Sequence, residues 1–225
     1  MSSSMSADST WNDAKWQRYG LLSGVVFVAL NVVGLIAGGA PPSRDASAEK
    51  IAKYFVDKAG GIKLGAILFA IGLIFGLWWL ASLWRVIGRL EPDGPRLALV
   101  VVLGFVVSAA VAAVGQALFA GPALRLDTLG GTTELMWSLG FVVYSMVMAV
   151  TAAQMLALAV LVMRTKFLPV WMAWLALASA AVCAVATIGA GSEANIFLVF
   201  QMLGFVSWML WVLIASVLLY MRKEA

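Results

Sequence analysis

Long apolar runs separated by short polar segments dominate the pattern of this chain. Each run has at least about the 20 residues that a helix needs to cross the hydrocarbon core of a bilayer, and none carries a charge in its interior. The apolar residues show no strand-like alternation, and a helix satisfies its backbone hydrogen bonds within itself, as lipid requires. The pattern predicts six transmembrane helices, at about 20–39, 62–84, 97–120, 135–163, 168–190 and 196–220.

The six runs use up most of the 225 residues, so we expect one transmembrane domain over 20–222. A polar, serine-rich tail precedes it at 1–19, and a short segment, 223–225, follows it. Tryptophan and basic residues gather at the end of the tail, as is typical of an anchor at the membrane interface.

The connection after the first run contains an amphipathic segment at 46–59. Ile51 and Phe55 fall on its apolar face, while the charged residues lie elsewhere. Glycines commonly end helices, and Gly60 and Gly61 follow directly. We therefore expect a separate short helix that lies in the membrane interface with its apolar face against the acyl chains.

The composition agrees with a membrane protein. Of all residues, 63% are hydrophobic and 12% are charged, which leaves too little polar surface to cover a soluble fold. The predicted fold class is all-α, a multi-pass transmembrane helical bundle, and the expected location is the cytoplasmic (inner) cell membrane.

The basic residues predict the orientation of the bundle. The net charge is +4, but the basic residues are scattered between the apolar runs and form no dense block, so we expect no nucleic-acid partner. With both termini in the cytoplasm, nine Lys and Arg residues fall on the cytoplasmic side and six on the other. Because Lys and Arg favour the cytoplasmic side, we expect both termini there.

Several turn and interface motifs are similar to those of a known group of proteins. They are Pro41-Pro42, Ala46-Ser47-Ala48-Glu49, Tyr54-Phe55 and Leu168-Pro169-Val170-Trp171. In these motifs and in its layout the chain resembles a family of six-helix bacterial integral membrane proteins, common in actinobacteria, for which no activity is established. The resemblance covers nearly the whole chain and implies the fold, but it supplies no catalytic residue.

Catalytic chemistry has little support in the sequence. The chain contains no histidine, which removes imidazole acid–base chemistry and His-ligated metal or haem. Its single cysteine, Cys183, has no base nearby in sequence, and the carboxylates are not spaced as in an HExxH or aspartyl site. We therefore expect no enzyme, no catalytic residue, no metal site and no cofactor.

Polar and large aromatic side chains inside the predicted spans are the candidate ligand-lining residues. The polar ones either line a path for a solute or bond to neighbouring helices, and the tryptophans either wall a cavity for lipid or quinone or fill the core. These residues are Asn31, Gln116, Tyr144, Thr151, Gln154, Gln201, Trp208 and Trp211.

Glycines at helical spacing are the candidate packing residues, because a glycine lets a neighbouring backbone approach closely. They lie in the first and second predicted spans and are Gly20, Gly24, Gly34, Gly38, Gly72 and Gly76. We expect this face of the first span to be a helix contact.

Together these features lead to a noncatalytic membrane protein, either an accessory or assembly subunit or a binder of hydrophobic small molecules or lipid. A small transporter or channel is the alternative. The expected partners are membrane lipids, a hydrophobic small molecule, and a second copy of the chain or another membrane protein.

Overall fold

Six long helices form the bundle in a computed structural model, which describes residues 13–91 and 93–222. All six helical stretches are long and apolar enough to cross a membrane, and no strand occurs in the described part of the chain. The prediction of an all-α bundle with six such helices is confirmed. Its elements are α1 (Asp13–Gly38), α2 (Ala48–Ile87), α3 (Arg96–Leu124), η1 (Leu126–Thr128), α4 (Gly131–Thr165), α5 (Val170–Thr187), η2 (Ile188–Gly191) and α6 (Ile196–Met221).

Local chemistry sets several of these boundaries. Pro95 and Pro169 precede α3 and α5, where a missing N–H costs no helical hydrogen bond. Lys166 ends α4 in the left-handed conformation, at φ 52°, and its N–H donates to the carbonyl oxygen of Val162. The predicted tail at 1–19 is helical from Asp13 onward, and the rest of it lies outside the described residues.

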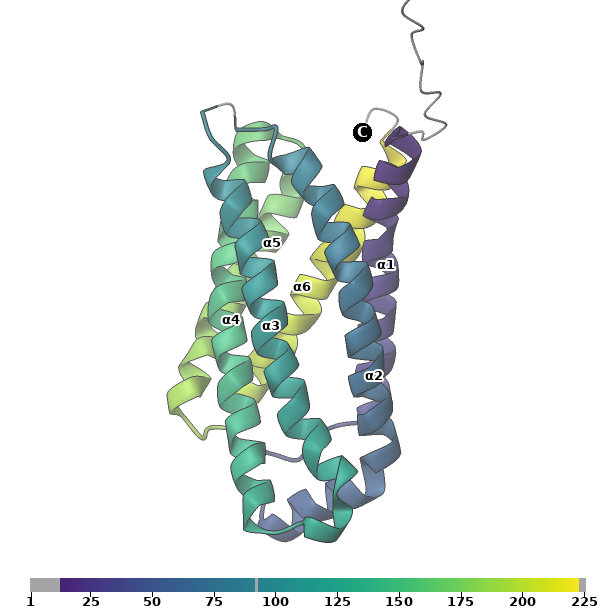
Figure 1. Cartoon of the computed structure of the whole chain (residues 1–225). Helices are drawn as coiled ribbons and strands as arrows, with labels where there is room; N and C mark the ends of the chain where they lie inside the picture. Colours follow the sequence, from purple (N-terminus) through teal and green to yellow (C-terminus); the bar gives the residue numbers. More distant parts are fainter. Residues whose placement is uncertain (1–12, 92, 223–225) are drawn as a thin grey trace, which may run out of the picture.

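The helices run up and down, so that α1 begins and α6 ends at the same end of the bundle (Figure 1). There Arg18 Nη2 donates to the carbonyl oxygen of Tyr220 at 3.2 Å, and the guanidinium lies 5.1 Å from the centre of the Tyr220 ring. We call this the terminal end. The opposite end, with the α1–α2, α3–α4 and α5–α6 connections, is the loop end.

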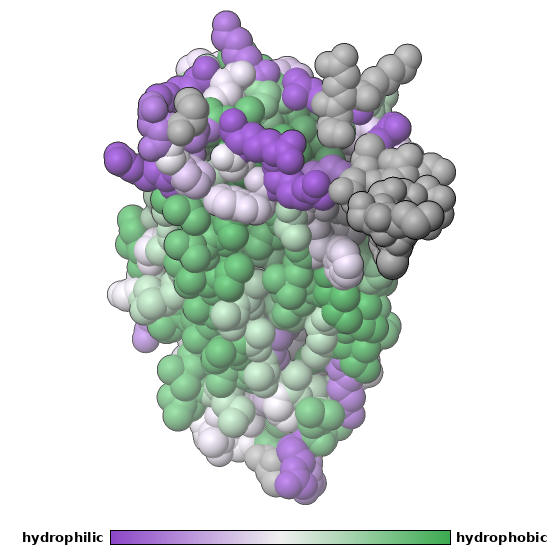
Figure 2. All heavy atoms as spheres, turned by 45° about the horizontal axis from the view of Figure 1, so that its top comes forward, coloured by the Kyte–Doolittle hydropathy of each residue, from purple (hydrophilic) through white to green (hydrophobic). Residues whose placement is uncertain are grey.

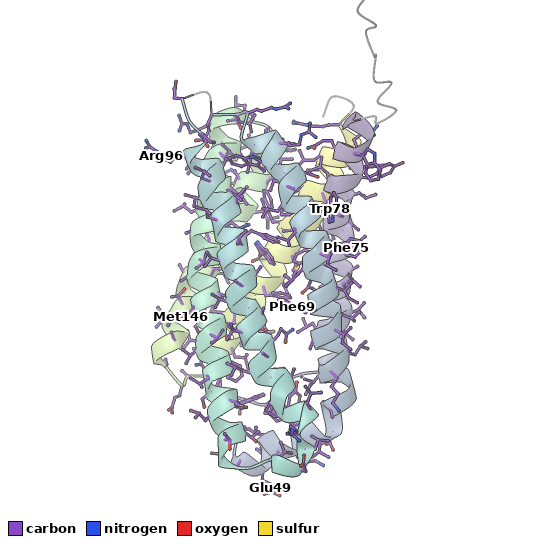
Figure 3. All side chains as sticks on the ribbon, in the orientation of Figure 1. Glu49, Phe69, Phe75, Trp78, Arg96 and Met146 are labelled. Atoms are coloured by element: carbon purple, nitrogen blue, oxygen red, sulfur yellow. The ribbon has the colours of Figure 1, made fainter. Side chains whose placement is uncertain are left out.

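The flank of the bundle is apolar. Figure 2 shows a broad hydrophobic band below the terminal end, where hydrophilic residues gather. Large side chains such as Ile36 and Trp78 are exposed on this flank, which lipid tolerates and water does not. Charged residues mark the two ends, with Arg96 at the terminal end and Glu49 at the loop end (Figure 3).

Close contact between α1 and α2 depends on glycine. A Cβ at Gly34 would lie 3.2 Å from the Cα of Gly65, so a larger residue there would hold the two backbones apart. Nearer the terminal end, Gly20 lies against Ser82, and Gly24 lies against Trp79 of α2 and Ser216 of α6.

Three further candidate packing glycines differ in their surroundings. On α2, Gly72 faces the side chain of Asn31, and Gly76 faces Phe27 and Phe105. A Cβ at Gly38 of α1 would meet no described atom within 4 Å. A side chain at Gly38 would therefore not hold α1 and α2 apart, although the backbone nitrogen of Gly38 would lie 3.4 Å from a Cβ at Gly61 of α2.

In place of the separate helix predicted at 46–59, the structure has one continuous helix, because α2 runs through Gly60 and Gly61 without a break. A Cβ at Gly61 would meet the carbonyl oxygen of Ala37, so this glycine allows α2 to approach α1 and does not end a helix.

The apolar face of that segment also differs from the expectation. Ile51 and Phe55 are 3% and 0% exposed, and they pack in one cluster with Ala123 and Trp137. The first part of α2 lies across the loop end of the bundle (Figure 1). The predicted contact of this face with acyl chains is therefore wrong, because the ends of α3 and α4 cover it.

The neighbouring glycines Gly60 and Gly61 provide a matched test of the α1–α2 contact. Gly61→Ala should lower the free energy of unfolding by about 1–3 kcal/mol, because the added methyl meets backbone that cannot yield easily. Gly60→Ala, where a Cβ meets no described atom within 4 Å, should be neutral or stabilise by up to about 1 kcal/mol through helix propensity. Thermal unfolding in detergent measures both, and equal melting temperatures for the two variants would contradict the contact.

Candidate functional site

A cavity of about 220 Å³ lies inside the half of the bundle nearer the loop end. Residues of α1, α2, α3, α4 and α6 line it, among them Phe69 of α2, which Figure 3 labels. Helices α1 and α6 meet near the terminal end, where Gly24 lies against Ser216, and α6 then crosses the bundle obliquely (Figure 1). The two helices therefore diverge toward the loop end. Small lining residues such as Gly34 and Ala112 leave the resulting space unfilled.

Three aromatic rings bound the cavity toward the terminal end. The centroids of Phe27, Phe105 and Trp208 lie 5.9 Å from one another in each pair, and we call these three residues the aromatic floor. Behind it, Trp79 and Leu83 are fully buried in the main hydrophobic core. The cavity is therefore closed near the middle of the bundle.

A second group of rings bounds the cavity toward the loop end. Trp137 packs against Tyr54 at 5.7 Å and Phe119 at 5.3 Å between ring centroids, in edge-to-face arrangements that aromatic pairs favour. The hydroxyl of Tyr54 donates to the carbonyl oxygen of Gly38 at 3.1 Å, which joins the first part of α2 to the end of α1. Residues 39–61, the connection and the first part of α2, thus cover the cavity, and we call them the cover segment.

Arg44 and Asp45 fasten the cover segment to the α5–α6 connection. Arg44 Nη2 donates to the carbonyl oxygen of Gly189 at 2.8 Å, and the guanidinium lies 5.2 Å from the centre of the Phe141 ring. The backbone N–H of Arg44 donates to Asn195 Oδ1 at 2.8 Å, and Asn195 Nδ2 donates to Asp45 Oδ1 at 3.0 Å. The α1–α2 connection is therefore bonded to the α5–α6 connection.

The surroundings of Arg44 and Asp45 lower the pKa of both residues. Burial lowers the pKa of Arg44, an effect that Glu193 partly offsets, and arginine still keeps its charge at neutral pH. The hydrogen bond from Asn195, helped by Ser43, lowers the pKa of Asp45. Since a lowered carboxyl pKa favours the charged form, the stabilisation by Asp45 is present at neutral pH and is lost as the pH falls through that pKa.

Most of the predicted ligand-lining residues meet at the cavity, although they come from four helices. Two do not: Gln154 packs against Gly104, and the Trp211 Nε1–H donates to the carbonyl oxygen of Met172 at 3.1 Å in the core. Those that line the cavity are Asn31, Gln116, Tyr144, Thr151, Gln201 and Trp208.

Some of these polar groups are already engaged. Asn31 Nδ2 donates to the carbonyl oxygen of Phe27 at 2.8 Å, and Thr151 Oγ1 donates to that of Val147 at 2.9 Å. Gln201 Nε2 donates to Ser145 Oγ at 2.6 Å. These bonds hold the side chains at the cavity wall.

Other polar groups keep free hydrogen-bonding capacity. The Gln116 amide and the Tyr144 hydroxyl bond to none of the described residues, and neither Asn31 Oδ1 nor Gln201 Oε1 accepts a hydrogen bond from them. No described residue that lines the cavity is charged. The site can therefore bind an uncharged molecule, but its wall offers no ionised group for proton transfer.

The cysteine and carboxylate side chains of the described residues lie away from this wall. No group of three His, Cys, Asp or Glu residues that could hold a metal occurs in the described part of the chain. Cys183 is buried beside Gly204 and does not line the cavity.

Sequence reasoning missed the aromatic floor and the role of Arg44. Phe27 and Phe105 come from different helices and have no distinctive spacing, so only the packing of the bundle brings them together with Trp208. Arg44 counted in the sequence only as one basic residue of the orientation pattern. Its position in the proline-containing connection, ahead of the charged residues of α2, was the one available signal.

Substitution of Arg44 tests the attachment of the cover segment. Arg44→Gln removes a charged hydrogen bond worth about 1.5–3 kcal/mol, while Ile51 and Phe55, each worth a similar amount through burial, remain in place. We therefore expect the segment to loosen without detaching, and amide hydrogen exchange at residues 43–47 to become about 10- to 100-fold faster. Lys50→Gln, the same type of change at an exposed position of this segment, should leave exchange unchanged. Equal exchange in the two variants would show that Arg44 does not hold the cover segment.

Comparison with protein families, with curated proteins and with solved structures finds no match for this chain. The family resemblance of the turn motifs gains no support from these comparisons. Function therefore has to be inferred from the cavity and its surroundings.

Proposed function

We propose that this protein is a noncatalytic, multi-pass protein of the bacterial cytoplasmic membrane that binds a hydrophobic small molecule in the cavity. The observation that carries the proposal is the cavity itself: apolar walls with a few uncharged polar groups, bounded by rings on two sides. Ligand sites of small molecules have this composition, with few polar groups that orient a mostly apolar ligand.

The position of the glycines favours a binder over an assembly subunit. A subunit that docks through its small residues would leave a glycine face open to lipid for a partner helix. Gly20, Gly24 and Gly34 instead lie against Ser82, Trp79 and Gly65 within the chain. The glycine face of α1 is thus occupied by the bundle's own helices.

A small transporter is the second candidate, because Asn31, Gln116 and Gln201 meet at one cavity. Passage across the bundle would require the aromatic floor to open, and Gln154, the polar residue beyond it, lies off the cavity. Binding needs no such movement, so it is the preferred function.

We propose further that the terminal end faces the cytoplasm. Of the Lys and Arg residues in the described part of the chain, eight lie toward the terminal end and six toward the loop end. On this orientation the cavity lies in the outer half of the membrane. The exposed ion pair of Lys53 and Asp57, at 3.3 Å, would then lie in the outer interface.

Filling the cavity tests the binding function. Ala112 lines the cavity and Ala117 is exposed on the same helix, α3. Native mass spectrometry of gently extracted protein should find a bound hydrophobic molecule in the unmodified chain and in Ala117→Phe, and at least tenfold less of it in Ala112→Phe. A bound molecule that persists in Ala112→Phe, or none in the unmodified chain, would contradict the proposal.

Cysteine labelling tests the orientation. In a Cys183→Ala background, single cysteines at Gly94 and Thr165 report on the terminal end, and one at Asp127 reports on the loop end. An impermeant thiol reagent applied to intact cells should label only the cysteine at Asp127. Labelling of the cysteine at Gly94 or Thr165 would show that the terminal end faces outward. It would not affect the assignment of the cavity.

A further inference from the structure

The wall of the cavity limits the charge of its ligand. The cavity is bounded by aromatic rings on two sides, and no described lining residue is charged. An ionised group placed there would lose its hydration without gaining a partner, at a cost of several kcal/mol or more. The part of the ligand that enters the cavity is therefore uncharged.

The free polar groups define the chemistry that this part of the ligand needs. Gln116 on α3 and Tyr144 on α4 can each donate a hydrogen bond, and neither has a hydrogen-bond partner among the described residues. Polar groups inside an apolar site favour a ligand that satisfies them and disfavour one that leaves them unpaired. Two donors from two helices suit a ligand with two acceptor atoms at separate positions, and the free oxygens Asn31 Oδ1 and Gln201 Oε1 can accept hydrogen bonds from water that remains in the cavity.

The size and shape of the cavity restrict the class of ligand further. An apolar protein cavity of about 150 Å³ holds a benzene molecule, so about 220 Å³ accommodates one substituted ring but not the chains of a diacyl lipid. Aromatic side chains line the cavity from all five of its helices, including Phe27, Phe69, Phe119, Trp137 and Trp208. Such walls suit a planar ring.

A hydrocarbon chain attached to the ring needs an exit to the lipid. Leu35 on α1 and Met202 on α6 both line the cavity, and they are 39% and 36% exposed. These helices diverge toward the loop end (Figure 1). The space between them is the place where a chain can pass from the cavity into the bilayer.

We propose that the cavity binds an uncharged planar ring with two hydrogen-bond acceptors, such as a quinone head group, whose single hydrocarbon chain leaves between α1 and α6. Gln116 and Tyr144 donate to the two acceptors, and the aromatic floor packs beneath the ring. This assignment rests on the proposed binding function and adds the ligand class and its direction of entry.

Three probes with the same ten-carbon chain test the class in lipid nanodiscs. They are decyl-benzoquinone, decylbenzene, which lacks the acceptors, and 4-decylbenzoate, which carries a charge. The quinone should bind at least tenfold more tightly than either of the others. Gln116→Leu and Tyr144→Phe should each weaken quinone binding about tenfold and leave decylbenzene unchanged. Gln154→Leu, which removes the same type of amide outside the cavity, should change neither.

The outcomes separate this inference from the proposed function. Equal binding of quinone and decylbenzene, or tighter binding of the benzoate, overturns the ligand class. A molecule retained in native mass spectrometry but lost in Ala112→Phe would then still support a hydrophobic ligand. Binding of none of the probes, together with no retained molecule, overturns both proposals.

The exit between α1 and α6 has its own test. Leu35→Trp should weaken the decyl-quinone at least tenfold more than methyl-benzoquinone, because only the former has a chain that must pass. The exposed α1 residue Ile36 does not line the cavity, and Ile36→Trp is the control that should affect neither probe. An equal effect of Leu35→Trp on both probes would overturn the assigned route.

Discussion

The close approach of α1 to α2 is the contact on which the rest of the bundle depends. Gly34 and Gly65 bring the two backbones together, and Gly61 admits the carbonyl oxygen of Ala37. Lipid chains are as apolar as the helix surfaces, so in a bilayer the hydrophobic effect does not drive apolar helices together. Dispersion over such a close contact then supplies much of the attraction. A helix that follows α2 this closely cannot also follow the oblique path of α6. The space left between α1 and α6 becomes the cavity.

The sequence predicted the features that depend on one helix at a time. Continuous apolar runs were sufficient to predict six helices that are long and apolar enough to span a membrane, because hydrocarbon thickness and backbone hydrogen bonding limit the length and type of such segments. The same reasoning failed where a local signal had two physical meanings. At Gly61 the lack of a side chain serves close packing with α1, whereas glycine in that position also commonly ends a helix.

Features that depend on several helices could not be predicted. Asn31, Gln116 and Gln201 were recognisable as polar residues in apolar runs, yet nothing in the sequence stated that they share a cavity from which Gln154 is excluded. The burial of Phe55 depends likewise on the distant Trp137. Periodicity identifies an apolar face but not what covers it, and lipid and protein leave the same pattern in the sequence.

The continuity of α2 has a mechanical consequence. A separate surface helix could move without disturbing the long helices of the bundle, but the first part of α2 belongs to the same 40-residue helix as the part that runs along the bundle. Backbone hydrogen bonding continues through Gly60 and Gly61, and Gly61 lies against the carbonyl oxygen of Ala37, so the short arm across the loop end and the long arm along the bundle (Figure 1) are joined as one element. A displacement of its short arm at the loop end is therefore transmitted to the tilt of the long arm. The far end of the long arm, at Ile87, lies about 40 Å of helix from Gly61 at about 1.5 Å per residue, so a displacement of the short arm at the loop end would move α2 at the terminal end.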